Sequence, residues 1–356
     1  MAEYSSPNPI KEHYIAYFDL LGYRQFFVEV PEQAESLLAN VHNAITNAKN
    51  NMLASGNIEY FKDYINIKFK IKIFSDNIFV CLEKGDDLRV EKARAIFFLE
   101  IISEIQRNFI INHNLFLRGG ITKGNVSYNE DYIFGEGLIE AVNIEETTVY
   151  PRITLSKSLF IFLSNIVSYT SEEREKALAI ETRINNKEKI TQEDEDFYNL
   201  MLRLANSEYF LTKVFYHLTS KCYDEEICIS YLYKLNPMDY VSTENLSNIL
   251  SQLKQISPNV FEIMNGSLPD ISNNIDNMLS KHKKCVEEQI KKHGDYIDIG
   301  LNEREKALQR ERVLKKYVWV MKYHNDMCCR YNKMQYFINS TANCDAKFML
   351  LKVNVL

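Results

Sequence analysis

The sequence predicts an α+β fold, namely a ferredoxin-like βαββαβ core with an α-helical C-terminal extension. Strand-like and helix-like stretches alternate in that order up to about residue 156. Beyond that point the chain is typical of long helices, with faces rich in Glu and Lys and few glycines. We therefore predict two regions, residues 1–156 for the core and residues 157–356 for the helical extension.

The first strand is predicted over Tyr14–Phe18, a short aromatic-rich run that Asp19 and Gly22 end. Pro31 then opens a predicted helix, because apolar residues recur after it at helical spacing. These residues are Ala34, Leu37, Leu38, Val41, Ile45 and Ala48.

A β-hairpin follows. Apolar and polar residues alternate over residues 65–73, which is typical of a strand with one wet face. Ser75-Asp76-Asn77 is turn chemistry, and Ile78–Leu82 is the returning strand. In a βαββαβ unit the first and third strands are antiparallel neighbours, so we expect Asp19 and Asp76 to converge at one edge of the sheet.

A second helix is predicted from Val90 to Ile105, and the segment "LFLRGGITKGNV" then indicates a strand that runs into a glycine-rich bend. Arg118 and Lys123 lie beside these glycines, where they could bind a triphosphate. The alternative is a tight β-bend with two solvated cations.

Composition limits the classes of function. The net charge is −6 and basic residues form only short clusters, so we expect no nucleic acid as the main partner. The longest apolar runs fall far short of the roughly 20 residues that cross a bilayer, so we expect no membrane partner. The N-terminus lacks the apolar stretch of a signal peptide, and the seven cysteines are scattered. These features predict a cytoplasmic protein with reduced thiols.

The two aspartates carry the chemical prediction. Carboxylates that meet at a glycine-marked loop suit Mg²⁺ or Mn²⁺, which prefer oxygen ligands and bridge to phosphate. The backbone amides of Leu21, Gly22 and Tyr23 could cradle that phosphate. The alternative is that Asp19 caps a helix and Asp76 only closes a hairpin. His324 and Cys328 have helical spacing, but without further zinc ligands nearby we interpret them as core residues.

Several segments together resemble the class III nucleotidyl cyclase family. "FDLLGY" matches its F-x-D-hydrophobic-x-G-aromatic segment, and "FSD" matches its hairpin aspartate. The chain is most similar to the bacterial pyrimidine cyclases of the Pycsar anti-phage system, through "FSDNI", "LRGGITKG", "IFGEGLIEAVNIEETTVYPRITLS" and "LKKYVWVMKYHN". This resemblance spans nearly the whole chain, including the helical C-terminal half.

The resemblance implies an enzyme. Asp19 and Asp76 would be the carboxylate ligands of two Mn²⁺ or Mg²⁺ ions, with the Leu20 carbonyl as a further ligand. The 3′-hydroxyl of a pyrimidine nucleoside triphosphate, UTP in preference to CTP, would attack its own α-phosphate and release pyrophosphate. The resemblance also implies a homodimer with its sites at the interface, and an effector that responds to the cyclic nucleotide.

One departure from the family concerns the helix after the last glycines. The family has an Asn and an Arg there, four residues apart, and this chain has Ile139 and Asn143 at those places. Asn143 could still donate a hydrogen bond, and Arg118 or Arg152 could supply positive charge. Two other functions therefore stay open, a purine cyclase and a degenerate cyclase fold that senses nucleotides or acts as a scaffold.

The residues that would form the base pocket are also undecided. Tyr14 and Tyr17 of the first strand are candidate walls, and packing in the aromatic core explains them equally well.

Overall fold

The computed structural model of the chain describes residues 9–21, 36, 39, 43, 46, 69–129, 132–222, 224–233, 275–292 and 303–339. Gly22, Tyr23 and most of the helix predicted after Pro31 lie outside these residues. The four described residues between positions 36 and 46 are helical and exposed, as the outer face of that helix would be.

The described strands form one eight-stranded sheet in the order β2-β3-β1-β4-β6-β8-β7, with β5 paired to β4 outside this row. Neighbouring strands are antiparallel except β4 and β6, which run parallel. The strands are β1 (Lys11–Leu21), β2 (Lys70–Phe74), β3 (Asn77–Glu83), β4 (Phe116–Tyr128), β5 (Ile133–Phe134), β6 (Ile153–Leu155), β7 (Thr219–Lys221) and β8 (Ile227–Ile229). The protein is therefore α+β, as predicted.

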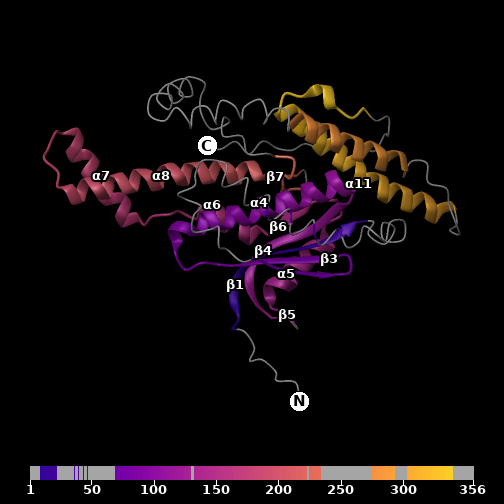
Figure 1. Cartoon of the computed structure of the whole chain (residues 1–356), viewed down its shortest axis with the longest axis horizontal. Helices are drawn as coiled ribbons and strands as arrows, with labels where there is room; N and C mark the ends of the chain where they lie inside the picture. Colours follow the sequence, from indigo (N-terminus) through magenta and orange to yellow (C-terminus); the bar gives the residue numbers. More distant parts are fainter. Residues whose placement is uncertain are drawn as a thin grey trace, which may run out of the picture.

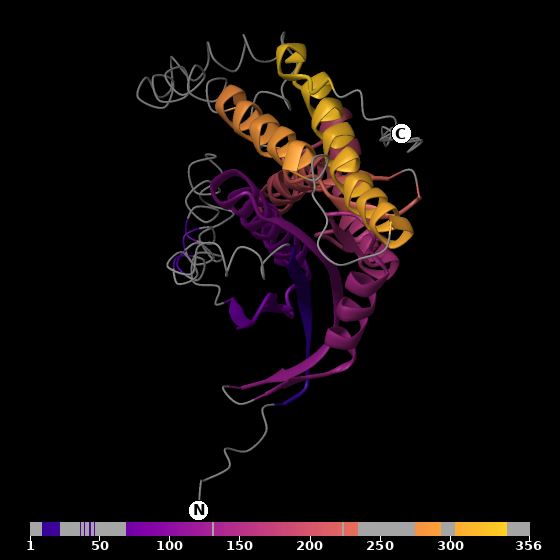
Figure 2. The same ribbon diagram turned by 90° about the vertical axis from the view of Figure 1, so that its right-hand side faces the viewer.

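Helices cover both faces of the sheet. They are α4 (Leu88–His113), α5 (Glu136–Thr147), α6 (Lys157–Asn165), α7 (Ser171–Asn185), α8 (Gln192–Leu218), a helix over residues 275–292, α11 (Glu303–Arg330) and the 3-10 turn η4 (Met334–Tyr336). Figure 1 shows α4 and α8 on one side of the sheet and α5 on the other. Figure 2 shows helix 275–292 and α11 packed side by side on the α4 side. Within the described ranges, no helix has the length and apolar character that a bilayer crossing requires.

Alternation along β1 divides the core into two parts. Even-numbered residues of β1, such as Tyr14 and Phe18, pack against α4 in the larger cluster, which also includes residues of α11. Ile15 packs in a smaller cluster with Ala141 of α5. Because successive side chains of a strand point to opposite faces, Tyr17 and Asp19 lie on the α5 face and Tyr14 lies on the α4 face.

The predicted hairpin is confirmed. β2 and β3 pair with Phe74 opposite Asn77, so that Ser75 and Asp76 alone form the turn. Ser75 adopts a left-handed backbone with φ of 58°. β1 is the antiparallel neighbour of β3, also as predicted.

The predicted glycine-rich bend is wrong. Gly119, Gly120 and Gly124 all lie inside β4, an unbroken strand of 13 residues. These glycines allow close packing instead of a turn: a Cβ built on Gly120 would lie 2.4 Å from the carbonyl oxygen of Ala141 in α5. The strand therefore continues through the glycines, and the missing side chains at Gly120 and Gly124 let α5 approach the sheet closely.

The region after residue 156 is helical only in part. Long helices, as expected for this region, are present near its end as helix 275–292 and α11. The region also adds β7 and β8 to the sheet, which was not predicted, and β8 pairs with β6. Sheet and hydrophobic core both continue across residue 156. The division into two regions at that point stays a prediction.

Candidate active site

The structure brings the two predicted aspartates to the same end of the sheet. Asp19 lies opposite Asn77 of β3, and the amide of Leu20 donates a hydrogen bond of 2.8 Å to the carbonyl oxygen of Asp76. The expectation that the strand ends at Asp19 is wrong, because β1 continues to Leu21 by pairing with the start of β4. Since Asp19 lies inside a paired strand, it does not cap a helix.

Asp19 lies in a partly buried, negatively charged setting. Its side chain is 20% exposed. Burial raises the pKa of Asp19, and the nearby carboxylates of Glu145 and Asp76 raise it further, while Arg118 and Lys316 oppose this rise. Two like charges beside a partly desolvated carboxylate favour either a proton or a cation at this position.

Arg118 of β4 is the nearest described cation to Asp19. Its Nε donates a hydrogen bond of 2.7 Å to Glu145 Oε1, and its Nη2 lies 3.6 Å from Asp19 Oδ2. Glu145 is a buried residue of α5, 6% exposed. Arg118 therefore links α5 to β1 and partly neutralises both carboxylates.

Sequence reasoning missed Glu145. The signal was available, because Gly137, Ala141 and Glu145 recur every four residues and form the buried side of α5. An acidic residue on the buried face of an amphipathic helix indicates a charged partner across the interface.

Lys316 of α11 is a second residue that the sequence did not reveal. Burial lowers its pKa, the nearby Arg118 lowers it further, and Asp19 acts in the opposite direction. The next residue, Tyr317, packs its ring edge-on against Phe116 at the start of β4, 5.4 Å between centroids. The C-terminal half of the chain therefore contributes a cation beside Asp19.

The other predicted site residues separate into two groups. Tyr17 lies on the same face as Asp19, and burial together with Glu145, Asp19 and Asp76 raises its pKa. Tyr14 is buried on the opposite face, where its hydroxyl donates to Glu91 of α4.

Lys123 is not brought to the aspartates. It lies on the α4 face, five positions along β4 from Arg118, and pairs with Glu12. Its ammonium lies 4.7 Å from the ring centroid of Phe162. A strand turns alternate side chains to opposite faces, so Arg118 and Lys123 cannot bind one phosphate chain together from the same strand.

Arg152 and Asn143 make no contact with Asp19 or Asp76 among the described interactions. Asp224 binds Arg152 through two hydrogen bonds of 3.0 and 2.6 Å, so this guanidinium is already paired. Asn143 is exposed on the outer side of α5, one turn after Ile139, which is 62% exposed.

The residues present fit a divalent cation that completes its coordination with substrate and water. Among the described residues, His, Cys, Asp and Glu side chains form no group of three or more that could hold a metal ion. Two carboxylates and a backbone carbonyl suffice for Mg²⁺, because this ion commonly keeps several waters and binds substrate phosphates. Asp19, Asp76 and the Leu20 carbonyl are the groups that could hold it.

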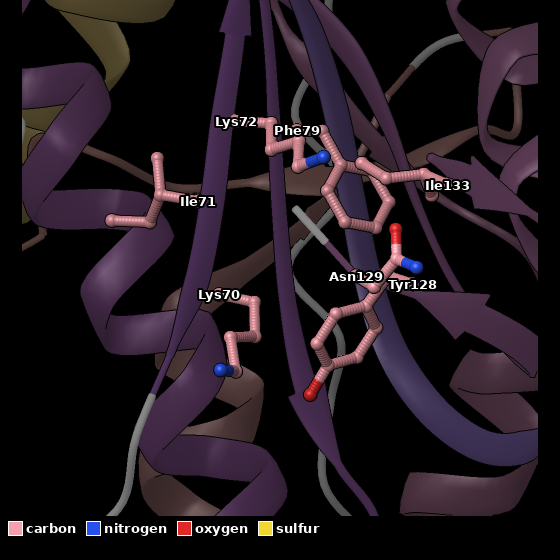
Figure 3. Close-up of a pocket in the computed structure, with 7 residues that line it drawn as sticks. All are labelled: Lys70, Ile71, Lys72, Phe79, Tyr128, Asn129 and Ile133. Carbon is pink, nitrogen blue, oxygen red and sulfur yellow. The ribbon is translucent and has the colours of Figure 1, made fainter. Parts of the chain in front are cut away.

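A pocket opens on the same face of the sheet (Figure 3). Its volume is about 310 Å³. It is lined by Lys70, Ile71, Lys72, Phe79, Tyr128, Asn129 and Ile133. Phe79 of β3 lies opposite Lys72 of β2 and Tyr17 of β1. It is two residues along β3 from Asn77, which lies opposite Asp19. Two strand residues span about 7 Å, so Phe79 and Lys72 mark the end of the pocket nearest the aspartates, and Lys70 and Tyr128 lie farther along the sheet.

The pocket combines positive charge with aromatic surface. Lys70 lies 5.5 Å from the centroid of the Tyr128 ring, which comes from the end of β4. A planar, electron-rich ligand with oxygen acceptors matches such a lining.

A scan against models of known protein families finds no match to this chain, and a search of curated proteins finds no relative.

Proposed function

We propose that this chain is a metal-dependent nucleotidyl cyclase that converts a pyrimidine nucleoside triphosphate, UTP in preference to CTP, to its 3′,5′-cyclic monophosphate and pyrophosphate. The observation that carries the proposal is the pairing of β1 with the hairpin, which sets Asp19 beside the turn of Asp76. The finer fold proposed is a cyclase core of the ferredoxin-like βαββαβ type, supported by the strand order β2-β3-β1-β4.

Asp19 and Asp76 would hold two Mn²⁺ or Mg²⁺ ions, with the Leu20 carbonyl as a further ligand. These ions would lower the pKa of the ribose 3′-hydroxyl and offset the negative charge on the α-phosphate. The hydroxyl oxygen forms the new bond to the α-phosphorus, its proton passes to solvent, and pyrophosphate leaves. The chain itself positions the substrate, and Arg118 and Lys316 add positive charge beside Asp19.

The pocket would receive the base. Lys72 supplies an ammonium donor and Phe79 an aromatic wall, with Tyr17 between the pocket and Asp19. Uracil presents two carbonyl oxygens to such donors, whereas cytosine replaces one of them with an amino group that is itself a donor. This difference favours UTP.

A homodimer would complete the site. Ile139 and Asn143 are exposed on α5, and Ile139 is an apolar side chain with most of its surface open. In the proposed dimer these residues would face the partner's substrate. We further propose that the product acts in anti-phage signalling through an effector that binds the cyclic nucleotide.

Two other functions are tested by the same experiment. A purine cyclase would use the same aspartates with ATP or GTP. A degenerate cyclase fold would bind nucleotides without turnover, and the absence of the family's Asn and Arg at positions 139 and 143 favours it.

The purified protein is incubated separately with ATP, GTP, CTP and UTP in the presence of Mn²⁺, and the products are identified by mass spectrometry. We expect cyclic UMP from the wild type and none from Asp76→Ala. The matched control is Asp86→Ala, an exposed loop aspartate after β3, which should keep full activity.

Each other outcome selects a different conclusion. Cyclic AMP or cyclic GMP would replace the pyrimidine assignment with the purine one. Saturable triphosphate binding without product, unchanged in Asp76→Ala, would replace the enzyme with the sensor or scaffold.

A further inference from the structure

Two cysteines face each other across the hairpin of β7 and β8. Cys222 follows β7, Cys228 lies in β8, and their Sγ atoms are 3.0 Å apart. Cys228 lies opposite Ser220, and the amide of Cys222 donates to the carbonyl oxygen of Glu226. The two cysteines are therefore diagonal neighbours on one face of the sheet, across its last pair of strands. A disulfide needs its sulfurs only about 1 Å closer than they are here.

A guanidinium lies beside this pair. Asp224, in the turn of the same hairpin, fixes Arg152 through two hydrogen bonds, and Arg152 is 3% exposed. Its Nε is buried without a hydrogen-bond partner among the described residues. A thiolate at Cys222 would place a negative charge beside the buried guanidinium of Arg152, whose Nε–H could donate to it.

The two thiols are electrostatically unequal. The hydrogen bond from Cys228 lowers the pKa of Cys222, and Arg152 lowers it further against the effect of burial. The same hydrogen bond and burial raise the pKa of Cys228. Cys222 is thus the sulfur that ionises first, and Cys228 remains the protonated neighbour, which is the arrangement of an attacking and a resolving thiol.

The other buried cysteines lack this arrangement. Burial raises the pKa of Cys81 to about 12, of Cys285 to about 11 and of Cys328 to about 12. A thiol with a raised pKa carries little thiolate and reacts slowly with oxidants.

We propose that Cys222 and Cys228 form a redox-active dithiol, which hydrogen peroxide converts to an intramolecular disulfide. The Cys222 thiolate attacks one oxygen of the peroxide, the O–O bond breaks, and the released hydroxide takes a proton to become water. Cys222 is then a sulfenic acid. The Cys228 sulfur attacks the sulfur of Cys222, the S–S bond forms, and the sulfenic oxygen leaves as a second water. The cysteines lose two electrons and the peroxide gains them.

Burial decides which oxidants can act. Cys222 and Cys228 are 1% and 0% exposed, so an oxidant reaches them only when the hairpin opens locally, and hydrogen peroxide, which is close to water in size, needs a smaller opening than a bulky disulfide such as oxidised glutathione. The disulfide would close a loop over residues 222–228, which contains Asp224 and hence the contact that fixes Arg152. The carbonyl oxygen of Arg152 in turn accepts a hydrogen bond of 3.0 Å from the amide of Gly119 in β4.

The test uses the full chain, treated with hydrogen peroxide, alkylated and mapped by mass spectrometry. We expect one tryptic peptide that holds Cys222 and Cys228 in an internal disulfide, lighter by two hydrogens than its reduced form and returned to the reduced mass by dithiothreitol. In Cys228→Ser, Cys222 should accumulate as a sulfenic acid that dimedone traps. In Cys222→Ser, no disulfide should form at Cys228.

Cys285→Ser is the matched control, because this buried thiol has no part in the pair and the disulfide should form unchanged. Circular dichroism verifies that each variant is folded. Peroxide that leaves the pair reduced while it oxidises the exposed Cys329 would overturn the proposal. A disulfide that joins either cysteine to any other partner would overturn it as well.

Discussion

Acid should weaken the C-terminal half of the protein through two buried histidines. His282 and His324 stack at 5.0 Å between ring centroids, with their Nδ1 atoms 2.9 Å apart. His324 Nε2 lies 2.9 Å from the carbonyl oxygen of Tyr336, which can only accept, so His324 carries its proton on Nε2 and accepts at Nδ1. His282 must then donate from Nδ1 and accept at Nε2 from the hydroxyl of Tyr231, 3.0 Å away.

This chain of hydrogen bonds requires both rings to be neutral. A proton added to His324 would go to its Nδ1 and place two N–H donors face to face between the Nδ1 atoms. A proton added to His282 would go to its Nε2, so the Tyr231 hydroxyl could no longer donate there. Burial lowers the pKa of His324 to about 4, an effect that Lys283 increases, and burial lowers the pKa of His282 as well. Both side chains are 0% exposed.

The sign and size of the effect follow from linkage. The pKa of an unfolded histidine is about 6.5, so between that value and the folded value the unfolded chain binds more protons. Stability is therefore full above the unfolded pKa and is lost as the pH falls toward the folded pKa. At about pH 5 the loss from His324 is about 2 kcal/mol, from about 1.5 pH units at about 1.4 kcal/mol each.

The assay is urea denaturation at about pH 7.5 and about pH 5. The chain has one tryptophan, Trp319, which stacks on Tyr323 at 5.8 Å, so its fluorescence reports on α11 beside the histidines. We expect His324→Gln to reduce the loss between the two pH values by about 2 kcal/mol, since glutamine can donate and accept but does not titrate.

Asn325→Ala is the control. Asn325 exchanges two hydrogen bonds with Ile338 and so anchors the same terminal segment without titrating. It should lower stability equally at both pH values. An acid-induced loss in His324→Gln as large as in the wild type would refute the reasoning.

Three further predictions concern close packing and buried charge. Gly120→Ala should destabilise the fold by about 1–3 kcal/mol in urea denaturation, because its methyl group would press on the backbone of α5; an unchanged midpoint would mean that α5 sits farther from β4. Lys92→Met should cost about 3–5 kcal/mol, because the carboxylate of Glu208 would stay buried without its partner, and adding Glu208→Leu should restore part of that loss. Glu145→Gln should lower the pKa of Asp19 in an NMR titration, because one of the charges that raise it disappears; a higher pKa would contradict the assignment.

Local patterns predicted the hairpin and the convergence of the aspartates. Ser75 and Asp76 are residues that favour turns, so the sequence predicts the hairpin. The βαββαβ order then places β1 beside β3, and this brings Asp19 and Asp76 together although they are far apart in the sequence. The glycines of β4 were misread, because a glycine that makes room for a helix looks the same in sequence as one that makes a turn.

Tertiary partners explain the other omissions. Lys316 gains its role only because α11 packs against the start of β4, and no local pattern encodes that contact. β7 and β8 are three residues each, too short for alternation to stand out from the end of the long helix α8. The missed strands and the missed cation thus have one cause, which is pairing between distant segments.

The junction of β6 and β8 also has a consequence during synthesis. β6 ends at Leu155 and β8 begins at Ile227, so 72 positions of chain separate the last residue of one from the first of the other. At about 5–20 residues per second, the ribosome needs on the order of 4–14 s to deliver β8. During that time β6 is an edge strand of the incomplete sheet, and an edge strand can pair with a strand of another nascent chain. Because β6 is only three residues long, it presents few unpaired N–H and C=O groups until β8 is synthesised, which limits pairing between chains.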